Sequence, residues 1–145
     1  MTIRRGALEP VEPPGWRRGS GYSHGMLAPA GGRVLFIAGQ VGWDQEERLA
    51  GPGFVEQFER ALANVMAVLA AAGGAAHHLG RLTVYVVDRA EYLEALAEVG
   101  AIYRRVVGRH FPAMALVEVA ALLEPDALVE IEATAVLPAA TGEQE

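Results

Sequence analysis

Two glutamates, Glu130 and Glu132, alternate with apolar residues in the segment "ALVEIEATAVL" (residues 127–137). Alternation of this kind is typical of a β-strand and places Glu130, Glu132 and Thr134 on one face. A carboxylate held in a cleft can accept and return a proton, which makes the two glutamates candidates for general acid–base chemistry. Simple exposure to solvent is the more frequent arrangement for glutamates. The strand pattern alone leaves both interpretations open.

The composition excludes several other kinds of site. The chain has no cysteine, which rules out disulfides, thiolate nucleophiles and cysteine metal sites. It also has no lysine, since all 12 basic residues are arginine, and this rules out Schiff-base chemistry through a lysine and a P-loop lysine. The 18 acidic residues give a net charge of −6, which disfavours binding to nucleic acid.

The remaining polar residues carry weaker signals. The four histidines, at positions 24, 77, 78 and 110, show no spacing typical of a metal site, so we expect neither a metal nor a cofactor. Ser23 precedes His24, but no third residue completes a triad, and sequence neighbours rarely pair in catalysis.

A strand-rich segment begins the part of the chain that must position these residues. Residues 22–41 predict two short strands joined at Pro29–Gly32 in a hairpin. The second of these, "RVLFIAGQV", is almost continuously apolar, so we expect both of its faces to be covered. Residues 54–74 predict a helix, because apolar residues recur at helical spacing and Gly73–Gly74 ends the pattern.

The second half of the chain continues the alternation of strands and helices. A strand is predicted at residues 81–88. Asp88, with Glu91 three residues later, predicts the capped start of a second helix, which ends at Gly108. Two further strands, at residues 113–120 and 127–137, complete the order β-β-α-β-α-β-β.

This order predicts one α+β domain at residues 21–138, with two helices on one face of a sheet. Residues 1–20 predict an irregular N-terminal arm, and residues 139–145 a C-terminal tail. The other sheet face is too apolar for water, so we expect a homo-oligomer in which neighbouring subunits cover it. No apolar run is long enough to span a membrane, and no signal peptide is evident, so we expect a cytoplasmic protein.

Six short segments stand in a fixed order between Tyr22 and Leu137. They are "YSHG" (22–25), "LFIAGQVGWD" (35–44), "QFERALANVMAVLAAAG" (57–73), "VYVVDRAEYLEAL" (84–96), "FPAMALVEVA" (111–120) and "VEIEATA" (129–135). Together they resemble the Rid family, the reactive intermediate deaminases that are also called YjgF-like proteins.

The resemblance implies a chorismate-mutase-like fold with a mixed β-sheet. It also implies a homotrimer with the sheets inside, the helices outside and small-molecule sites in the clefts between adjacent subunits. The best-known members hydrolyse enamine and imine products of pyridoxal-phosphate enzymes, releasing ammonia and a 2-keto acid. Some members are described as endoribonucleases, but the acidic charge argues against a nucleic-acid partner here.

The resemblance also indicates candidate site residues. Glu130 matches the glutamate that activates water and carries a proton to the departing amine. Tyr22 matches a tyrosine that lines the cleft, and Gly39 matches the position whose backbone amide faces the ligand. The deaminases place an arginine two residues after the loop proline, where its planar fork binds the substrate carboxylate. Here Pro112 is followed by Met114 at that position.

Three other positions that are often polar in the family also carry apolar or small residues in this chain. Ala38 replaces a common serine, Leu116 a common cysteine and Gly100 a common asparagine. Because Met114 and Leu116 lie on the same face of one strand, they predict a continuous apolar wall in the ligand site.

Two functions from different classes fit this pattern. One is a hydrolase or deaminase that uses Glu130 on an imine or enamine metabolite without the usual carboxylate. The other is a non-catalytic trimer that binds an apolar metabolite or a protein partner. The retained glutamate favours the enzyme, and Arg105 and Arg109 are the candidates to replace the missing guanidinium.

Overall fold

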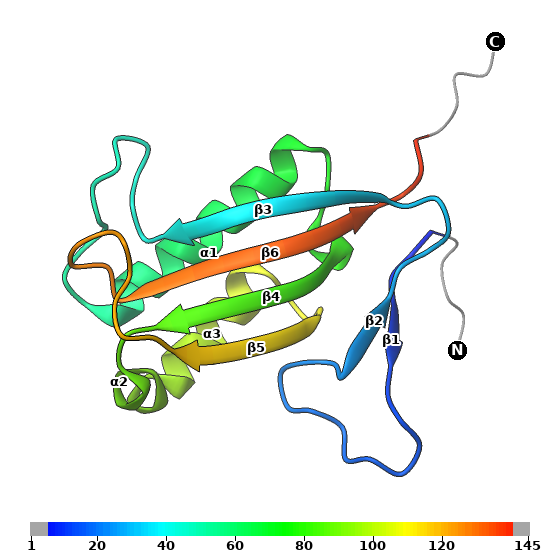
Figure 1. The fold of residues 1–145 in the computed structure, drawn as a ribbon, viewed down its shortest axis with the longest axis horizontal. Coiled ribbons are helices and arrows are strands. Elements are labelled where there is room, and N and C mark those ends of the chain that lie inside the picture. The colour runs from blue at the N-terminus through cyan, green and yellow to red at the C-terminus, as the bar shows by residue number, and fades with distance from the viewer. Residues whose placement is uncertain (1–5, 141–145) are drawn as a thin grey trace.

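A four-stranded sheet forms the centre of the molecule in the computed structural model, which describes residues 6–140 (Figure 1). The strand order is β3 (Arg33–Val41), β6 (Val129–Leu137), β4 (Leu79–Val86) and β5 (Ala113–Glu118). The β4–β5 pair is parallel and the other pairs are antiparallel, so the sheet is mixed as predicted. Residues 1–5 of the expected arm and 141–145 of the expected tail lie outside the described residues.

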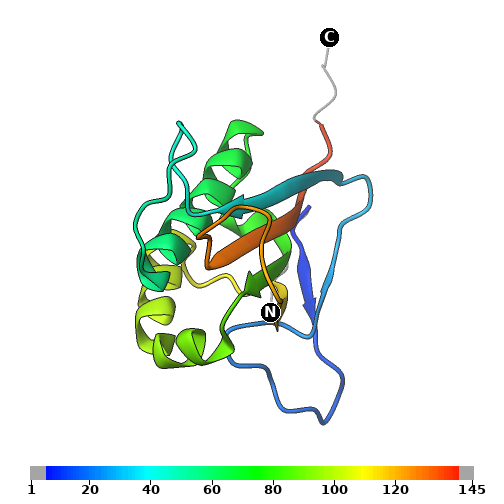
Figure 2. The same ribbon diagram turned by 60° about the vertical axis from the view of Figure 1, so that its left-hand side comes forward.

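The three α-helices found in residues 6–140 lie on one face of this sheet, as Figure 2 shows. They are α1 (Phe54–Ala71), α2 (Arg89–Glu94) and α3 (Leu96–Val106), and a short 3-10 turn, η1 (Ala76–His78), precedes β4. The apolar stripe of α1 is buried against β3, β6 and α3. The predicted α+β architecture is therefore confirmed. None of the helices in the described part of the chain combines the length and apolar character that a bilayer crossing requires.

The predicted second helix is correctly capped but is divided in two. The Asp88 carboxylate accepts hydrogen bonds from the N–H groups of Ala90 and Glu91, which begins α2. The chain then breaks at Ala95, whose N–H donates to Tyr92 three residues back rather than four. This tighter turn interrupts the regular helix before α3 begins, so the expectation of one continuous helix is wrong.

The N-terminal segment also differs from the prediction. Strand β1 (Glu9–Val11) lies within the arm that was expected to be irregular, and it pairs with β2 (Gly25–Leu27) in a separate two-stranded sheet. The predicted hairpin between β2 and β3 is therefore wrong, because β2 takes a different partner. Strand β1, with only three residues, is too short for alternation to reveal it in the sequence.

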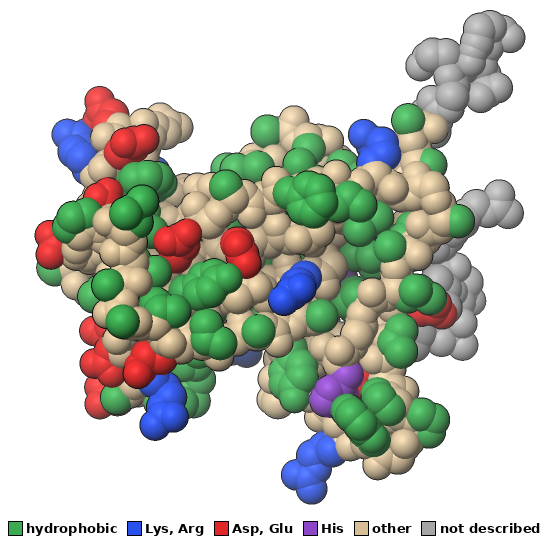
Figure 3. Space-filling view, in the orientation of Figure 1, with side chains coloured by type: hydrophobic (Ala, Val, Ile, Leu, Met, Phe, Trp, Pro, Cys, Tyr) green, Lys and Arg blue, Asp and Glu red, His purple; other side chains and the backbone are tan. Residues whose placement is uncertain are grey.

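The sheet face opposite the helices carries apolar side chains that nothing in the described chain covers (Figure 3). Phe36 is 80% exposed, and Val34 and Val117 are exposed as well. An exposed apolar surface of this kind is typical of a protein interface. We therefore expect other copies of the chain to cover this face.

Gln57 joins α1 to the loops at one end of the sheet. Its side chain is fully buried, and its Nε2 donates to the carbonyl oxygens of Gly51 and Asp126. Its Oε1 accepts a hydrogen bond from the N–H of Leu128, directly before β6. One amide therefore positions the strand that bears Glu130.

The substitution Gln57→Leu should lower the free energy of unfolding by about 2–4 kcal/mol, because it leaves buried backbone groups without partners. Urea unfolding measures this loss. The control Gln45→Leu, in the exposed loop between β3 and α1, should change the free energy by less than about 0.5 kcal/mol. Equal effects of the two substitutions would show that the Gln57 hydrogen bonds do not stabilise the fold.

Candidate functional site

The register of the sheet separates the candidate site residues into two groups. Strand β4 pairs Leu82 with Met114 on β5 and Tyr85 with Glu130 on β6. Paired residues point to the same face of a sheet, and residues an odd number of positions apart point to opposite faces. Met114 therefore faces the helices and Glu130 faces away from them. In one chain these two side chains cannot line the same cavity.

The group on the helix side surrounds an apolar cavity of about 600 Å³, here called the β5 pocket. Met114 and Leu116 form part of its wall together, and Tyr22 and Gly100 line it as well. Core residues of the sheet and of α1 and α3 complete the lining, including Phe58, Leu82, Val99 and Tyr103. The structure thus brings together four of the positions that the resemblance singled out.

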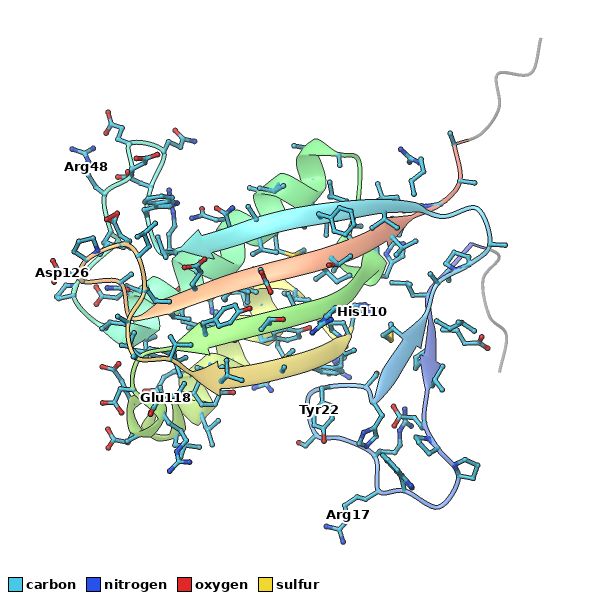
Figure 4. All side chains as sticks on the ribbon, in the orientation of Figure 1. Arg17, Tyr22, Arg48, His110, Glu118 and Asp126 are labelled. Carbon is cyan, nitrogen blue, oxygen red and sulfur yellow. The ribbon has the colours of Figure 1, made fainter. Side chains whose placement is uncertain are left out.

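Ser23 holds Tyr22 against the start of β5. The Ser23 Oγ donates a hydrogen bond to the carbonyl oxygen of Phe111 at 2.6 Å, and its N–H donates to that of Pro112 at 3.1 Å. Ser23 is buried by this contact. Figure 4 shows Tyr22 on the loop beside this end of β5. Ser23 therefore positions a site residue, a role that its place beside His24 in the sequence does not indicate.

The loop before β5 is held from the other side by Tyr103. The Tyr103 hydroxyl donates to the carbonyl oxygen of His110 at 2.6 Å, and its ring stacks on that of Phe111. Burial raises the pKa of Tyr103 well above its usual value, so this hydroxyl stays a donor at neutral pH. His110 in turn has its Nε2 2.7 Å from the carbonyl oxygen of Leu79. These contacts fix the backbone that leads to Met114.

The second group, here called the Glu130 corner, consists of Ala38, Gly39 and Glu130 where β3 pairs with β6. The register shifts between Ile37 and Gln40, so Ala38 and Gly39 form a β-bulge. A Cβ at Gly39 would lie 2.9 Å from the Cδ of Glu130 and would collide with the carboxylate. Glycine at this position therefore leaves room for the Glu130 carboxylate, which a longer residue would force to move.

Glu132 lies on the same face but has a different environment. The Tyr85 hydroxyl donates to Oε2 of Glu132 at 2.9 Å, and this bond raises the pKa of Tyr85. The hydrogen bonds formed among residues 6–140 leave the Glu130 carboxylate without a partner. Both oxygens of Glu130 are therefore free of side-chain and backbone partners in the described chain, whereas Glu132 shares Oε2 with Tyr85 and lines a second cavity on this face together with Ala38.

One arginine lines the β5 pocket, and it is not one of the two candidates from the sequence. Arg105 forms an ion pair with Glu59 on α1, and Arg109 is exposed outside the pocket lining. Arg104 does line the pocket, four residues after Gly100 on the same face of α3. This i, i+4 spacing is the sequence signal that could have identified Arg104.

The histidines have local structural contacts. The ring of His24 meets Trp16 and Tyr22 edge-on, with centroids 5.2 and 5.4 Å away. Nδ1 of His78 accepts a hydrogen bond from Ala75, and burial lowers the pKa of His78. Within the described residues, no group of three or more histidine, aspartate or glutamate side chains is arranged to hold a metal ion.

Comparison with known proteins gives one consistent family. The family model described as Endoribonuclease L-PSP matches residues 18–137. The RutC family protein UK114 of Drosophila melanogaster is 34% identical over 130 residues, which cover 89% of this chain and 83% of that protein. A protein named 2-iminobutanoate/2-iminopropanoate deaminase from Homo sapiens is 33% identical over 116 residues, 79% of each chain.

Solved structures agree with this result. The Rid family protein YyfB of Yersinia pestis, whose function is described as unknown, matches with a TM-score of 0.80 at 33% identity, over 90% of this chain and 99% of that one. Rv2704 of Mycobacterium tuberculosis, of the YjgF/YER057c/UK114 family, matches with a TM-score of 0.59 at 31% identity, over 81% and 87% of the two chains. Sequence and fold together show that the chain belongs to the Endoribonuclease L-PSP family, the Rid or YjgF-like proteins.

Proposed function

We propose that this protein hydrolyses the C–N bond of an imine or enamine metabolite in a cleft between two copies of the chain. The observation that carries the proposal is the register of the sheet, which separates the β5 pocket from the Glu130 corner within one chain. A complete site then needs the pocket of one copy and the acid of another. Relatives named 2-iminobutanoate/2-iminopropanoate deaminase support the reaction class.

The uncovered face of the sheet supplies the surface for this assembly. Phe36 and Val34 are exposed on the same face as Glu130, so an interface that buries them also brings the Glu130 corner against a neighbour. A homotrimer with the sheets inside and the helices outside both buries these apolar side chains and brings each Glu130 corner against a neighbouring copy. Every copy then contributes one pocket and one acid, and the cyclic symmetry makes the clefts equivalent.

The proposed reaction needs only water and the Glu130 carboxylate. Glu130 accepts a proton from water as the water oxygen attacks the carbon of the protonated imine, which gives a neutral carbinolamine. It then returns this proton to the nitrogen, the C–N bond breaks with release of ammonia, and the hydroxyl proton passes back to Glu130 as the carbonyl product forms. An enamine follows the same route after protonation at carbon converts it to the imine. The backbone amide of Gly39, which the resemblance to the family assigns to the ligand side of the cleft, then donates a hydrogen bond to the intermediate.

The wall of the β5 pocket determines which part of the substrate lies there. Met114 stands where the family's deaminases bind a carboxylate, and neither Met114 nor Leu116 can donate a hydrogen bond. An apolar group of the substrate therefore packs at this wall, and short polar imino acids are expected to be poor substrates.

A second candidate is a non-catalytic trimer that binds an apolar metabolite or a protein partner. The observation that favours it is that Ala38, Gly100, Met114 and Leu116 stand at positions where family members often carry hydrogen-bonding side chains. Three of these residues, Gly100, Met114 and Leu116, line the β5 pocket. Such a protein would bind a ligand tightly without turnover, and the Glu130 carboxylate would be dispensable.

The substitution Glu130→Gln should lower kcat by about 10²- to 10⁴-fold with little change in KM, because it removes the proton acceptor and keeps the shape. Ammonia release from imines, generated in solution by an amino-acid oxidase from a panel of amino acids, measures the rate over background. Glu132→Gln is the control, since it changes the neighbouring carboxylate on the same face, whose Oε2 accepts a hydrogen bond from Tyr85, and it should retain most of the activity. Equal rates for the wild type and Glu130→Gln would remove Glu130 from the mechanism.

The substitution Gly39→Ala should lower kcat by about 10- to 100-fold, because the new methyl group must displace the Glu130 carboxylate from its position. Gly80→Ala, on β4, is the matched control, since its added Cβ would make only an ordinary contact at 3.6 Å. The ammonia-release assay, together with the melting temperature of each variant, distinguishes displacement of the Glu130 carboxylate from loss of the fold. Full activity in a folded Gly39→Ala protein would contradict the role given to this close approach.

A further inference from the structure

Arg104 stands at the rim of the β5 pocket with its side chain exposed to solvent. Its Nη1 lies 3.6 Å from the point where a Cβ on Gly100 would stand, and no other described side chain comes within 4 Å of that point. The guanidinium therefore lies over Gly100, in space that a longer residue would fill. The glycine makes room for the arginine at the mouth of the cavity.

The charge of Arg104 is not neutralised within the described chain. Arg105, the next residue, pairs with Glu59, but no described carboxylate pairs with Arg104. The described residues that line the β5 pocket include no aspartate or glutamate. A guanidinium presents parallel N–H donors that match the two oxygens of a carboxylate, and it binds that group more strongly where apolar surface excludes water.

We propose that Arg104 binds a carboxylate of the substrate at the α3 rim of the β5 pocket, while an apolar part of the same molecule packs against Met114 and Leu116. This inference rests on the proposed function, since it names the substrate class of the same cleft. The ligand is then an amphiphilic acid with a large apolar body rather than a molecule without charge. The positive charge that binds the carboxylate then lies on α3, whereas the family's deaminases carry it on β5. The substrate therefore lies in the cleft in a different orientation.

A single guanidinium favours a carboxylate over a phosphate. Besides Tyr103, the lining of the pocket offers the hydroxyl groups of Ser20, Tyr22 and Tyr92 as polar side-chain groups, and all three are neutral. The hydroxyl of Tyr103 already donates to the carbonyl oxygen of His110. One positive charge with few neutral donors matches a singly charged, planar anion better than a phosphate, which carries more charge and more oxygens.

Calorimetric titration of the full-length wild-type chain with phenylpyruvate and with its methyl ester tests this directly. The two probes share an apolar ring and a 2-keto group, and only the first carries a carboxylate. Wild-type protein should bind the acid about 10- to 100-fold more tightly than the ester. Arg104→Met should lose this preference and bind both probes as the wild type binds the ester. Arg104→Lys should keep part of it, because an ammonium retains the charge without the fork.

Arg105→Met is the matched control, since it removes the same charge one residue later, at a side chain that pairs with Glu59. It should keep the full preference for the acid, and melting temperatures would show that each variant is folded. No preference in the wild type, or an unchanged preference in Arg104→Met, would overturn the inference and leave Arg104 as a cation at the end of a helix.

Two different results would separate the role of Arg104 from the hydrolysis of imines. If the wild type shows the preference but releases no ammonia from any imine, the proposed function fails and the assignment of Arg104 stands. If the wild type releases ammonia and Arg104→Met retains both the preference and the KM for carboxylate-bearing imines, the assignment of Arg104 fails alone.

Discussion

The pairing of β4 with its two neighbours is the constraint on which the site depends. Met114 and Glu130 are both aligned with β4, opposite Leu82 and Tyr85, which are three residues apart and so point to opposite faces. No side-chain rearrangement can bring the two together, because a change of face would require a one-residue slip of a strand and would expose its core residues. The functional unit that we propose is therefore an assembly rather than a single chain.

The contacts that stabilise the fold also position the two halves of this site. Gln57 fixes the entry to β6, and Ser23 and Tyr103 hold the backbone on either side of the loop before β5. At the Glu130 corner the constraint is steric, since the bulge brings the backbone of Gly39 against the carboxylate. Each half is thus built on rigid strands, which suits a cleft whose two walls come from different copies.

The sequence was sufficient to predict the elements with strong periodic signals. Helix α1, the cap at Asp88 and strand β6 follow from apolar spacing and capping residues, and the structure contains them. Local patterns could not predict that β2 pairs with β1, because the choice of a partner strand is a tertiary property. The break at Ala95 was missed for a similar reason, since the apolar stripe continues across it with no proline or glycine to mark it.

Local sequence patterns also could not predict how the site residues are distributed over the two faces of the sheet. The motif match pointed to Tyr22, Met114 and Glu130, and strand alternation placed Met114 beside Leu116. Which face of the sheet each residue occupies required the register, which a single sequence does not encode locally. The sequence did not distinguish Arg104 from the candidates Arg105 and Arg109, because only its spacing from Gly100 marks it as a residue of the pocket.

Mixing two inactive variants tests most directly whether each site is built from two copies. Glu130→Gln lacks the acid but keeps the β5 pocket, and Met114→Trp fills the pocket but keeps the acid. Each alone should be inactive, whereas trimers reassembled from an equal mixture should recover about a quarter of the wild-type ammonia release, since about that share of clefts would combine two intact halves. Mixed trimers with no recovered activity, or an active monomer, would contradict a site shared between neighbouring chains.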